Sequence, residues 1–381
     1  MDTKHNPFPT VGYVSKAYFC DRENELNILT KNLKSGVNIT LISNRRLGKS
    51  ALIHRLFEDI ETRKTTCIYI DIFAATSLKD ITNILATAIY TKFPPRKTIG
   101  RRFWDFVKTL RPIISFDLLT NKPELRFEFS HPKDFEKTLS GLLKFLDSQG
   151  QKTVLAIDEF QQIADCEEKN IEAILRTMVQ SLKNVNFIFC GSKKHFMLQI
   201  FNSAKRPFFA STMIVGLQEI DREIYKNFIA KQFKNHRRRI DDESLDFILD
   251  WTFGHTYYTQ MICGAVFSEN TRHNTLSVVK KVCEEQLEIL HTGFMQYRKL
   301  LSQRQWQVLT AIAKEEFVTE PQSQGFIGKH TLGAASSVNK ALQVLVDKEM
   351  VCTIELENRL AYRVYDVFLL RWLQSKFPSH F

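Results

Sequence analysis

Residues 39–52 read ITLISNRRLGKSAL and nearly match the phosphate-binding loop G-x-x-x-x-G-K-[S/T]. Ser43 stands where the motif has its first glycine, whereas Gly48, Lys49 and Ser50 are in place. The segment before the loop is apolar, and the segment after it has apolar residues at helical spacing. The sequence therefore predicts a buried strand, a phosphate-binding loop and a helix, in this order.

The chemistry of such a loop assigns roles to its residues. Backbone N–H groups and the N-terminus of the following helix bind phosphates, Lys49 reaches the β and γ oxygens, and Ser50 ligates Mg²⁺. The first glycine has a mainly conformational task, and serine can adopt turn geometries with help from its own hydroxyl. We therefore expect the loop to bind a nucleotide. The loop residues expected to surround it are Ser43, Asn44, Arg45, Arg46, Leu47, Gly48, Lys49, Ser50 and Ala51.

Two further strand ends complete the predicted site. The stretch VLAIDEF ends a strand with Asp158, which is expected to hold the magnesium through water, and Glu159, which is expected to polarise the attacking water. The alternative is that this acidic pair caps the next helix. The stretch FIFCGS puts Ser192 at the carboxyl end of the next strand, where ligands bind in open α/β sheets. Ser192 is expected to sense the γ-phosphate or to position the water.

The alternation of segments in the first two-thirds of the chain predicts the fold class. Short apolar runs alternate with amphipathic helical stretches, which is typical of a parallel sheet with helices on both faces. The first helix is expected over residues 21–36, with Asp21 as its N-cap, and Ser77 is expected to cap a later helix. The predicted strands are residues 38–43, 66–72, 152–157, 186–190 and 213–217. Residues 112–130 interrupt this alternation of strands and helices. Apolar residues alternate on both sides of Thr120–Pro123, which predicts an inserted β-hairpin with its turn there.

The last third of the chain changes character. From Asp221 to about His291 the pattern is wholly helical. From Ser302 it gives a helix, a loop, a second helix and two short extended runs, which is the order of a winged helix. The predicted division is a core over residues 1–220, a helical lid over 221–292 and a winged helix over 293–381.

Composition limits the possible classes of protein. The chain has 381 residues, 44% of them hydrophobic and 25% charged, and has no apolar run long enough to cross a bilayer. Its first residues lack the features of a signal peptide, and its seven cysteines form no C-x-x-C pair, so we expect a cytoplasmic protein without membrane partners. The net charge of +11 permits a polyanionic partner. Basic residues gather at 96–102 and 234–239, but both places also fit solvated helix ends or loops.

Six segments together resemble a known family. YFCDRENEL, SNRRLGKSALI, VLAIDEF, FIFCGS, KRPFF and FGHTYYTQ occur in this order and resemble the archaeal-type ATPases of the STAND/AAA+ P-loop class. The resemblance covers roughly residues 7–375 and implies a AAA+ core, a helical lid and a winged helix. It also implies ATP as the nucleotide, Mg²⁺ as the metal and slow ATP hydrolysis.

The same resemblance implies roles for residues outside the loop. Asp21, Arg22 and Glu23 belong to the segment beside the adenine, and His255 to the lid segment that faces the nucleotide. His255 equally fits a lid histidine with a structural role. Arg206 lies where AAA+ proteins often keep an arginine for the γ-phosphate of the neighbouring subunit. Here the sequence departs from the pattern, because no clear glycine–arginine finger is present, and a plain surface arginine is the alternative.

Two other nucleotide motifs fit less well. NKPE, at residues 121–124, resembles the guanine-reading N-K-x-D, but it precedes Asp158 and lies in the predicted hairpin turn. DEFQ resembles a helicase box, but the helical remainder after Asp221 cannot supply a second α/β domain. An adenine nucleotide is therefore favoured.

Two functions stay open at this point. In the first, the winged helix binds double-stranded DNA through a helix that offers Ser336, Ser337, Asn339 and Lys340. In the second, the protein is a STAND-type switch whose C-terminal domain contacts protein. Residues 294–381 contain eleven Lys and Arg against eight Asp and Glu, which is a modest excess for a DNA-binding domain. A homo-oligomer or a separate effector protein is the remaining expected partner.

Overall fold

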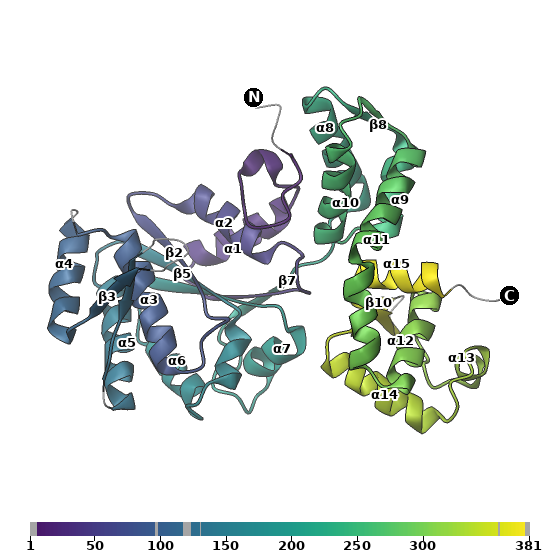
Figure 1. Ribbon diagram of the computed structural model, residues 1–381. Coiled ribbons are helices and arrows are strands. Elements are labelled where there is room, and N and C mark those ends of the chain that lie inside the picture. The colour runs from purple at the N-terminus through teal and green to yellow at the C-terminus, as the bar shows by residue number, and fades with distance from the viewer. Residues whose placement is uncertain (1–5, 96–97, 117–122, 130, 357–358, 378–381) are drawn as a thin grey trace. The chain divides into compact units, whose positions relative to one another are not determined.

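The computed structural model describes residues 6–95, 98–116, 123–129, 131–356 and 359–377 (Figure 1). The chain forms two compact units. The sheet unit is Val11–Ile220, and the helical unit joins the described residues of Met1–Thr10 to those of Asp221–Phe381.

The sheet unit is built on five parallel strands in the order β2-β5-β6-β1-β7. All five predicted strands are confirmed, and the run at 213–217 closes the sheet at one edge, beside β1. Because the strands are parallel, their carboxyl ends meet at one edge, where Asp71 pairs in register with Asp158 and Ile42 with Gly191. The strands are β1 (Ile39–Ile42), β2 (Thr65–Asp71), β5 (Lys152–Asp158), β6 (Val185–Gly191) and β7 (Met213–Gly216).

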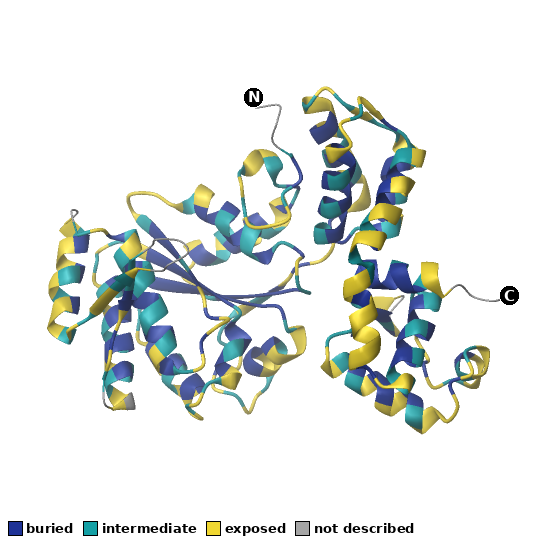
Figure 2. Ribbon diagram, viewed as in Figure 1, coloured by how far each residue is buried: buried dark blue, intermediate teal, exposed yellow. Residues whose placement is uncertain are grey.

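Helices cover both faces of this sheet (Figure 1). Side chains alternate along the strands, so that Cys67 packs on one face with α1 and α2, whereas Ile68 packs on the other with α3, α5 and α6. Figure 2 shows the buried residues that follow from this two-sided packing along the strands and the inner faces of the helices. The helices are α1 (Glu23–Lys34), α2 (Lys49–Ile60), α3 (Leu78–Lys92), α4 (Thr98–Val107), α5 (Pro132–Asp147), α6 (Ile171–Gln180) and α7 (Lys194–Asn202).

The start of α1 differs from the prediction. Asp21 does not cap this helix: Arg22 is the residue before the first helical turn, and no side chain makes a capping hydrogen bond. Asp21 and Arg22 have positive φ angles of 58° and 72°. An N-capping side chain needs an extended backbone to reach the N–H groups of the first turn, so this left-handed pair of residues excludes the expected cap.

The predicted hairpin is confirmed as an antiparallel pair, β3 (Ile113–Phe116) with β4 (Pro123–Arg126). Of the predicted turn at Thr120–Pro123, Pro123 is the first residue of β4, and the other three residues lie outside the described part of the chain. The hairpin is fixed to α3, because the backbone N–H of Leu125 donates to Thr87 Oγ1 over 2.9 Å and the Leu125 side chain is fully buried.

The first part of the helical unit is mostly helical, as predicted, but it also contains a short parallel pair, β8 with β9. The N-terminal residues Asn6 and Phe8 pack in this unit, although the predicted division assigned residues 1–220 to the core: Asn6 Nδ2 donates to Gly264 O over 2.9 Å. The elements are α8 (Arg222–Asn235), β8 (Arg239–Ile240), α9 (Asp242–Thr252), α10 (Thr256–Ser268), β9 (His273–Asn274) and α11 (Leu276–Leu300).

The second part has the order predicted for a winged helix, with two additional helices. Within the predicted loop lies α13, a helix of only six residues that is too short to show a periodic pattern and is capped by Ser323. The C-terminal α15 follows the β10–β11 hairpin. The elements are α12 (Gln303–Glu315), α13 (Gln324–Lys329), α14 (Ala335–Asp347), β10 (Val351–Leu356), β11 (Arg359–Val364) and α15 (Val367–Lys376).

The two parts of the helical unit share contacts. α11 runs without a break through residue 292, where the predicted boundary between lid and winged helix lies. Trp372 of α15 donates from Nε1 to Nδ1 of His291 on α11 over 3.1 Å. Arg371 of α15 donates to the carbonyl oxygens of Asp250 and Trp251 at the end of α9, each over 3.0 Å.

Two observations bear on the compositional expectations. All seven cysteines are free thiols. In the part of the chain that the structure describes, no helix is both long and apolar enough to cross a membrane.

The cap of α3 gives a test of this fold. Ser77 Oγ accepts a hydrogen bond from Asp80 N over 3.3 Å, as the sequence predicts. We expect Ser77→Ala to lower the free energy of unfolding by about 1 kcal/mol, measured by urea titration. Asn170 is the matched control, because it occupies the N-cap of α6 without a side-chain capping bond. An equal loss for Asn170→Ala would show that the Ser77 bond contributes nothing specific.

Candidate functional site

The loop between β1 and α2 leaves the sheet at the carboxyl edge. Gly48 ends this loop as the N-cap of α2, with φ 96° and ψ 20°, a left-handed conformation that favours glycine. A Cβ built on Gly48 would meet no other atom within 4 Å, so the space before the helix N-terminus is open. An open, N–H-lined helix start is what a phosphate group requires.

Lys49 and Ser43 meet inside this loop. The Lys49 side chain is only 6% exposed, and its Nζ lies 3.3 Å from Ser43 Oγ and 3.4 Å from Asn44 O. The Ser43 hydroxyl in turn donates to Asn44 O over 2.8 Å. Burial lowers the pKa of Lys49, and the nearby carboxylates of Asp158 and Glu159 partly oppose this shift. Ser43 therefore gives the lysine a hydroxyl partner that glycine lacks.

Asp158 is the most deeply held carboxylate of the site. It is 3% exposed and accepts hydrogen bonds from three donors. Ser50 Oγ and the Tyr69 hydroxyl both donate to its Oδ2 over 2.6 Å, and Glu159 N donates to its Oδ1 over 2.9 Å. The predicted metal-binding pair, Ser50 and Asp158, is therefore in direct contact.

Glu159 lies beside it in a left-handed conformation, with φ 53°. Its Oε2 accepts a hydrogen bond from Ser192 Oγ over 2.8 Å and another from Gln161 Nε2. Arg45 Nε donates to Ser192 Oγ over 3.4 Å. The first two contacts hold the carboxylate in one orientation, and Ser192 links it to the phosphate-binding loop.

The sequence prediction missed Tyr69 and Gln161. Tyr69 lies two residues before the end of β2, on the same side of the strand as Asp71, so strand alternation combined with the β2–β5 pairing would have indicated it. Gln161 lies in the short 3₁₀ turn Phe160–Asp165, and no periodic signal marks it. Burial raises the pKa of Tyr69, and the neighbouring Asp158 carboxylate adds to this shift.

Other predicted residues have contacts of their own. Arg22 is 4% exposed and forms an ion pair with Glu25 over 3.0 Å. Arg206 forms an ion pair with Glu172 over 2.5 Å. His255 lies in the helical unit, before α10, where its ring packs 4.8 Å from that of Tyr258. Their roles, and that of Asp21, toward a nucleotide or a neighbouring subunit stay predictions.

Within the loop, the side chains divide between core and solvent. Leu47 is 2% exposed and packs in the core beside α1 and α2, so only its backbone faces the loop. Arg46 is exposed and has a positive φ of 62°. Asn44 and Ala51 are half-buried on either side.

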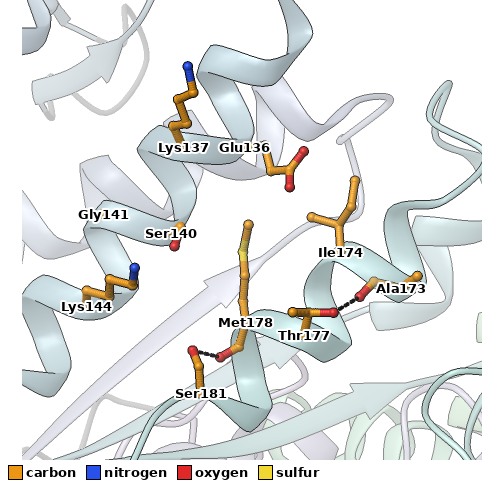
Figure 3. A pocket seen from close by; sticks show the side chains of 10 residues that line it. All are labelled: Glu136, Lys137, Ser140, Gly141, Lys144, Ala173, Ile174, Thr177, Met178 and Ser181. Atoms are coloured by element: carbon orange, nitrogen blue, oxygen red, sulfur yellow. Dashed lines mark hydrogen bonds between the residues drawn. The ribbon is translucent and has the colours of Figure 1, made fainter.

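A separate hollow of about 650 Å³ lies between α5 and α6 (Figure 3). Two of its hydroxyls bond within their own helical segment: Thr177 donates to Ala173 O over 2.8 Å, and Ser181 to Met178 O over 2.7 Å. Lys137 at its rim lies 3.5 Å from Asp134 on the same helix. These polar groups have local partners, so the hollow is a weaker candidate than the sheet edge.

The residues present fit a nucleotide with magnesium. Among the described residues, no cluster of three or more His, Cys, Asp or Glu side chains could hold a metal alone. Mg²⁺ does not need one, because it is usually held by one or two protein oxygens together with water and substrate phosphates. The Ser50 hydroxyl and the Asp158 carboxylate, 2.6 Å apart, are such oxygens.

Comparison with known proteins agrees with this geometry. Residues 19–262 match the family described as an ATPase domain predominantly from Archaea. The chain belongs to this family. Residues 292–375 also match a probable winged helix domain. No curated protein matches the chain.

Solved structures share the fold of this ATPase. A Walker-type ATPase of Pyrococcus abyssi is 18% identical with a TM-score of 0.64, over 97% of this chain and 99% of that one. The ORC2 protein of Aeropyrum pernix is 12% identical with a TM-score of 0.52, over 94% of each chain. The ORC1 protein of the same organism, solved in complex with DNA, is 13% identical with a TM-score of 0.51, over 98% of this chain and 94% of that one.

The loop geometry generates a paired prediction. Ser43→Gly should change the affinity for a fluorescent ATP analogue by less than tenfold, because the backbone must approach the phosphates most closely at Gly48, and the Ser43 hydroxyl contributes only its hydrogen bonds with Lys49 and Asn44 O. Gly48→Val should abolish binding, because φ at this position is 96° and a β-branched side chain would project toward the phosphates.

Circular dichroism of both variants provides the control for folding. A gain of orders of magnitude for Ser43→Gly would mean that the natural loop is impaired. Normal binding by Gly48→Val would mean that the loop does not bind phosphate.

Proposed function

We propose that this protein binds Mg·ATP at the carboxyl edge of its sheet, hydrolyses it, and couples the reaction to the winged helix. The observation that carries the proposal is the convergence of Lys49, Ser50, Asp158, Glu159 and Ser192 from the ends of two parallel strands, β5 and β6, and from the start of α2. The groups that we propose to contact phosphate, to hold the metal and to accept a proton thus lie at one edge of the sheet, as phosphoryl transfer to water requires.

Each residue has a role in this proposal. Lys49 and the N–H groups before α2 bind the β- and γ-phosphates, and Ser50 and Asp158 hold the magnesium, Asp158 through water. When bound, Mg²⁺ neutralises negative charge on the phosphate oxygens. Glu159 accepts a proton from the attacking water, while Ser192 and Gln161 orient its carboxylate. The Ser192 hydroxyl also lies where it can approach the γ-phosphate.

Substitutions separate binding from chemistry. Lys49→Ala should abolish ATP binding measured by calorimetry, because the described loop has no other buried ammonium group. Glu159→Gln should bind ATP like the natural protein but hydrolyse it at least about a hundredfold more slowly. Asp158→Asn should weaken only the magnesium-dependent part of binding. Unchanged affinity in Lys49→Ala, or unchanged turnover in Glu159→Gln, would contradict the proposal.

For the winged helix we propose DNA as the ligand. On α14, Ser336, Asn339 and Lys340 are exposed near the helix N-terminus, and Ser337 is half-buried. Polar and basic side chains at this end of a helix can contact phosphates and base edges. The likeness in fold to the ORC1 protein that was solved in complex with DNA supports the same choice.

The DNA proposal is tested by fluorescence anisotropy with duplex DNA at two salt concentrations, with ATP, with ADP and without nucleotide. Lys340→Ala should weaken binding about three- to tenfold and make the salt dependence shallower by about one phosphate contact. Lys348→Ala is the matched control, because Lys348 is an exposed lysine at the other end of α14.

The alternative is a STAND-type switch that contacts another protein. The near balance of eleven basic and eight acidic residues over 294–381 favours it. DNA binding that is absent at both salt concentrations, or that is equal for both lysine variants, would replace the DNA proposal by this one.

Arg206 would act on a neighbouring subunit only if it released Glu172, its present ion-pair partner.

A further inference from the structure

Asp158 has a partner that the proposed reaction does not yet explain. The Tyr69 hydroxyl donates to Asp158 Oδ2 over 2.6 Å, the same distance and the same oxygen as the Ser50 hydroxyl. Tyr69 comes from β2 and Ser50 from the start of α2. Two separate elements therefore aim a hydroxyl at one carboxylate oxygen.

The position of the phenol is fixed by its surroundings. Tyr69 packs against the core cluster formed by α1, α2 and one face of the sheet. Its ring lies 4.7 Å from that of His54, which projects from α2 one turn after Ser50. A rigid aromatic ring held between strand and helix places its hydroxyl with little freedom.

The two hydroxyls differ in what they can do when a metal arrives. Ser50 is expected to become a ligand of Mg²⁺, which commits one of its lone pairs to the metal. Tyr69 lies on β2, outside the phosphate-binding loop, and its hydroxyl keeps its contact with Asp158 Oδ2. A hydrogen bond to an ionised carboxylate is stronger than a neutral one and fixes its direction.

We infer that Tyr69 is a positioning residue for the magnesium site: its hydroxyl holds the Asp158 carboxylate in the orientation that receives the metal's water. This inference rests on the proposed function of the same site. It predicts that loss of the phenol hydroxyl weakens the magnesium-dependent part of nucleotide binding and leaves the magnesium-independent part unchanged.

The test uses the full chain and a fluorescent ATP analogue. Nucleotide binding is measured in EDTA, and the concentration of Mg²⁺ that gives half of the magnesium-dependent signal is then measured by titration. For Tyr69→Phe we expect this concentration to rise about five- to tenfold, with affinity in EDTA within twofold of the natural protein. Tyr90→Phe is the matched control, because Tyr90 is a half-buried tyrosine of α3 that packs on Trp104.

A second arm asks whether Tyr69 acts through Asp158. In an Asp158→Asn background, Tyr69→Phe should add no further loss, because the charged acceptor is already gone. An additive loss would overturn the inference, and so would an unchanged Mg²⁺ requirement or an equal loss in EDTA. If Tyr69→Phe does not fold by circular dichroism, Tyr69→Met removes the same donor and gives the same comparison.

Nucleotide binding by the natural protein distinguishes failure of this inference from failure of the proposed function. If it binds no nucleotide with Mg²⁺, both fail together. If it binds Mg·nucleotide and Tyr69→Phe behaves like Tyr90→Phe, only the role of Tyr69 is wrong.

Discussion

The buried carboxylate of Asp158 joins the parts of the sheet unit that the proposed reaction needs. A charged group that is 3% exposed is costly unless its oxygens accept hydrogen bonds. Here the donors come from the helix after the loop, from the neighbouring strand and from the next backbone amide. Loss of any one of them leaves a buried charge less well compensated. The loop, β2 and β5 are therefore tied to one another at the edge where the strands end.

The same edge of the sheet contains a second group of hydrogen bonds, around Glu159. Its carboxylate is held by Ser192 and Gln161, and Ser192 also accepts a hydrogen bond from Arg45 of the loop. A change in the loop could therefore reach the proposed base through the Ser192 hydroxyl. Asp158 and Glu159 are adjacent in sequence. Asp158 accepts hydrogen bonds from three donors, whereas Glu159 is linked to the phosphate-binding loop through Ser192. This difference is consistent with the proposed roles of Asp158 as a metal ligand and of Glu159 as a base.

The sequence could predict the elements whose signals are local. A buried strand followed by a glycine–lysine–serine turn, and an apolar run that ends in two acids, are readable without the fold. Tyr69 could not be assigned because its partner is 89 residues away and depends on which strands are neighbours. The N-cap prediction for α1 is wrong because Asp21 and Arg22 have a left-handed conformation, which their residue types do not indicate. Helix α13 was missed because six residues are too few to show a period.

The continuity of α11 has a consequence for how the helical unit can be divided. A winged helix cut out at residue 293 would start in the middle of a helix and would lose His291, the acceptor for the Trp372 indole. It would also leave Arg371 without the carbonyl oxygens of Asp250 and Trp251. The lid and the winged helix differ in sequence pattern, but these hydrogen bonds join α15 to α9 and α11. A change in α15 would therefore also act on α9 and α11.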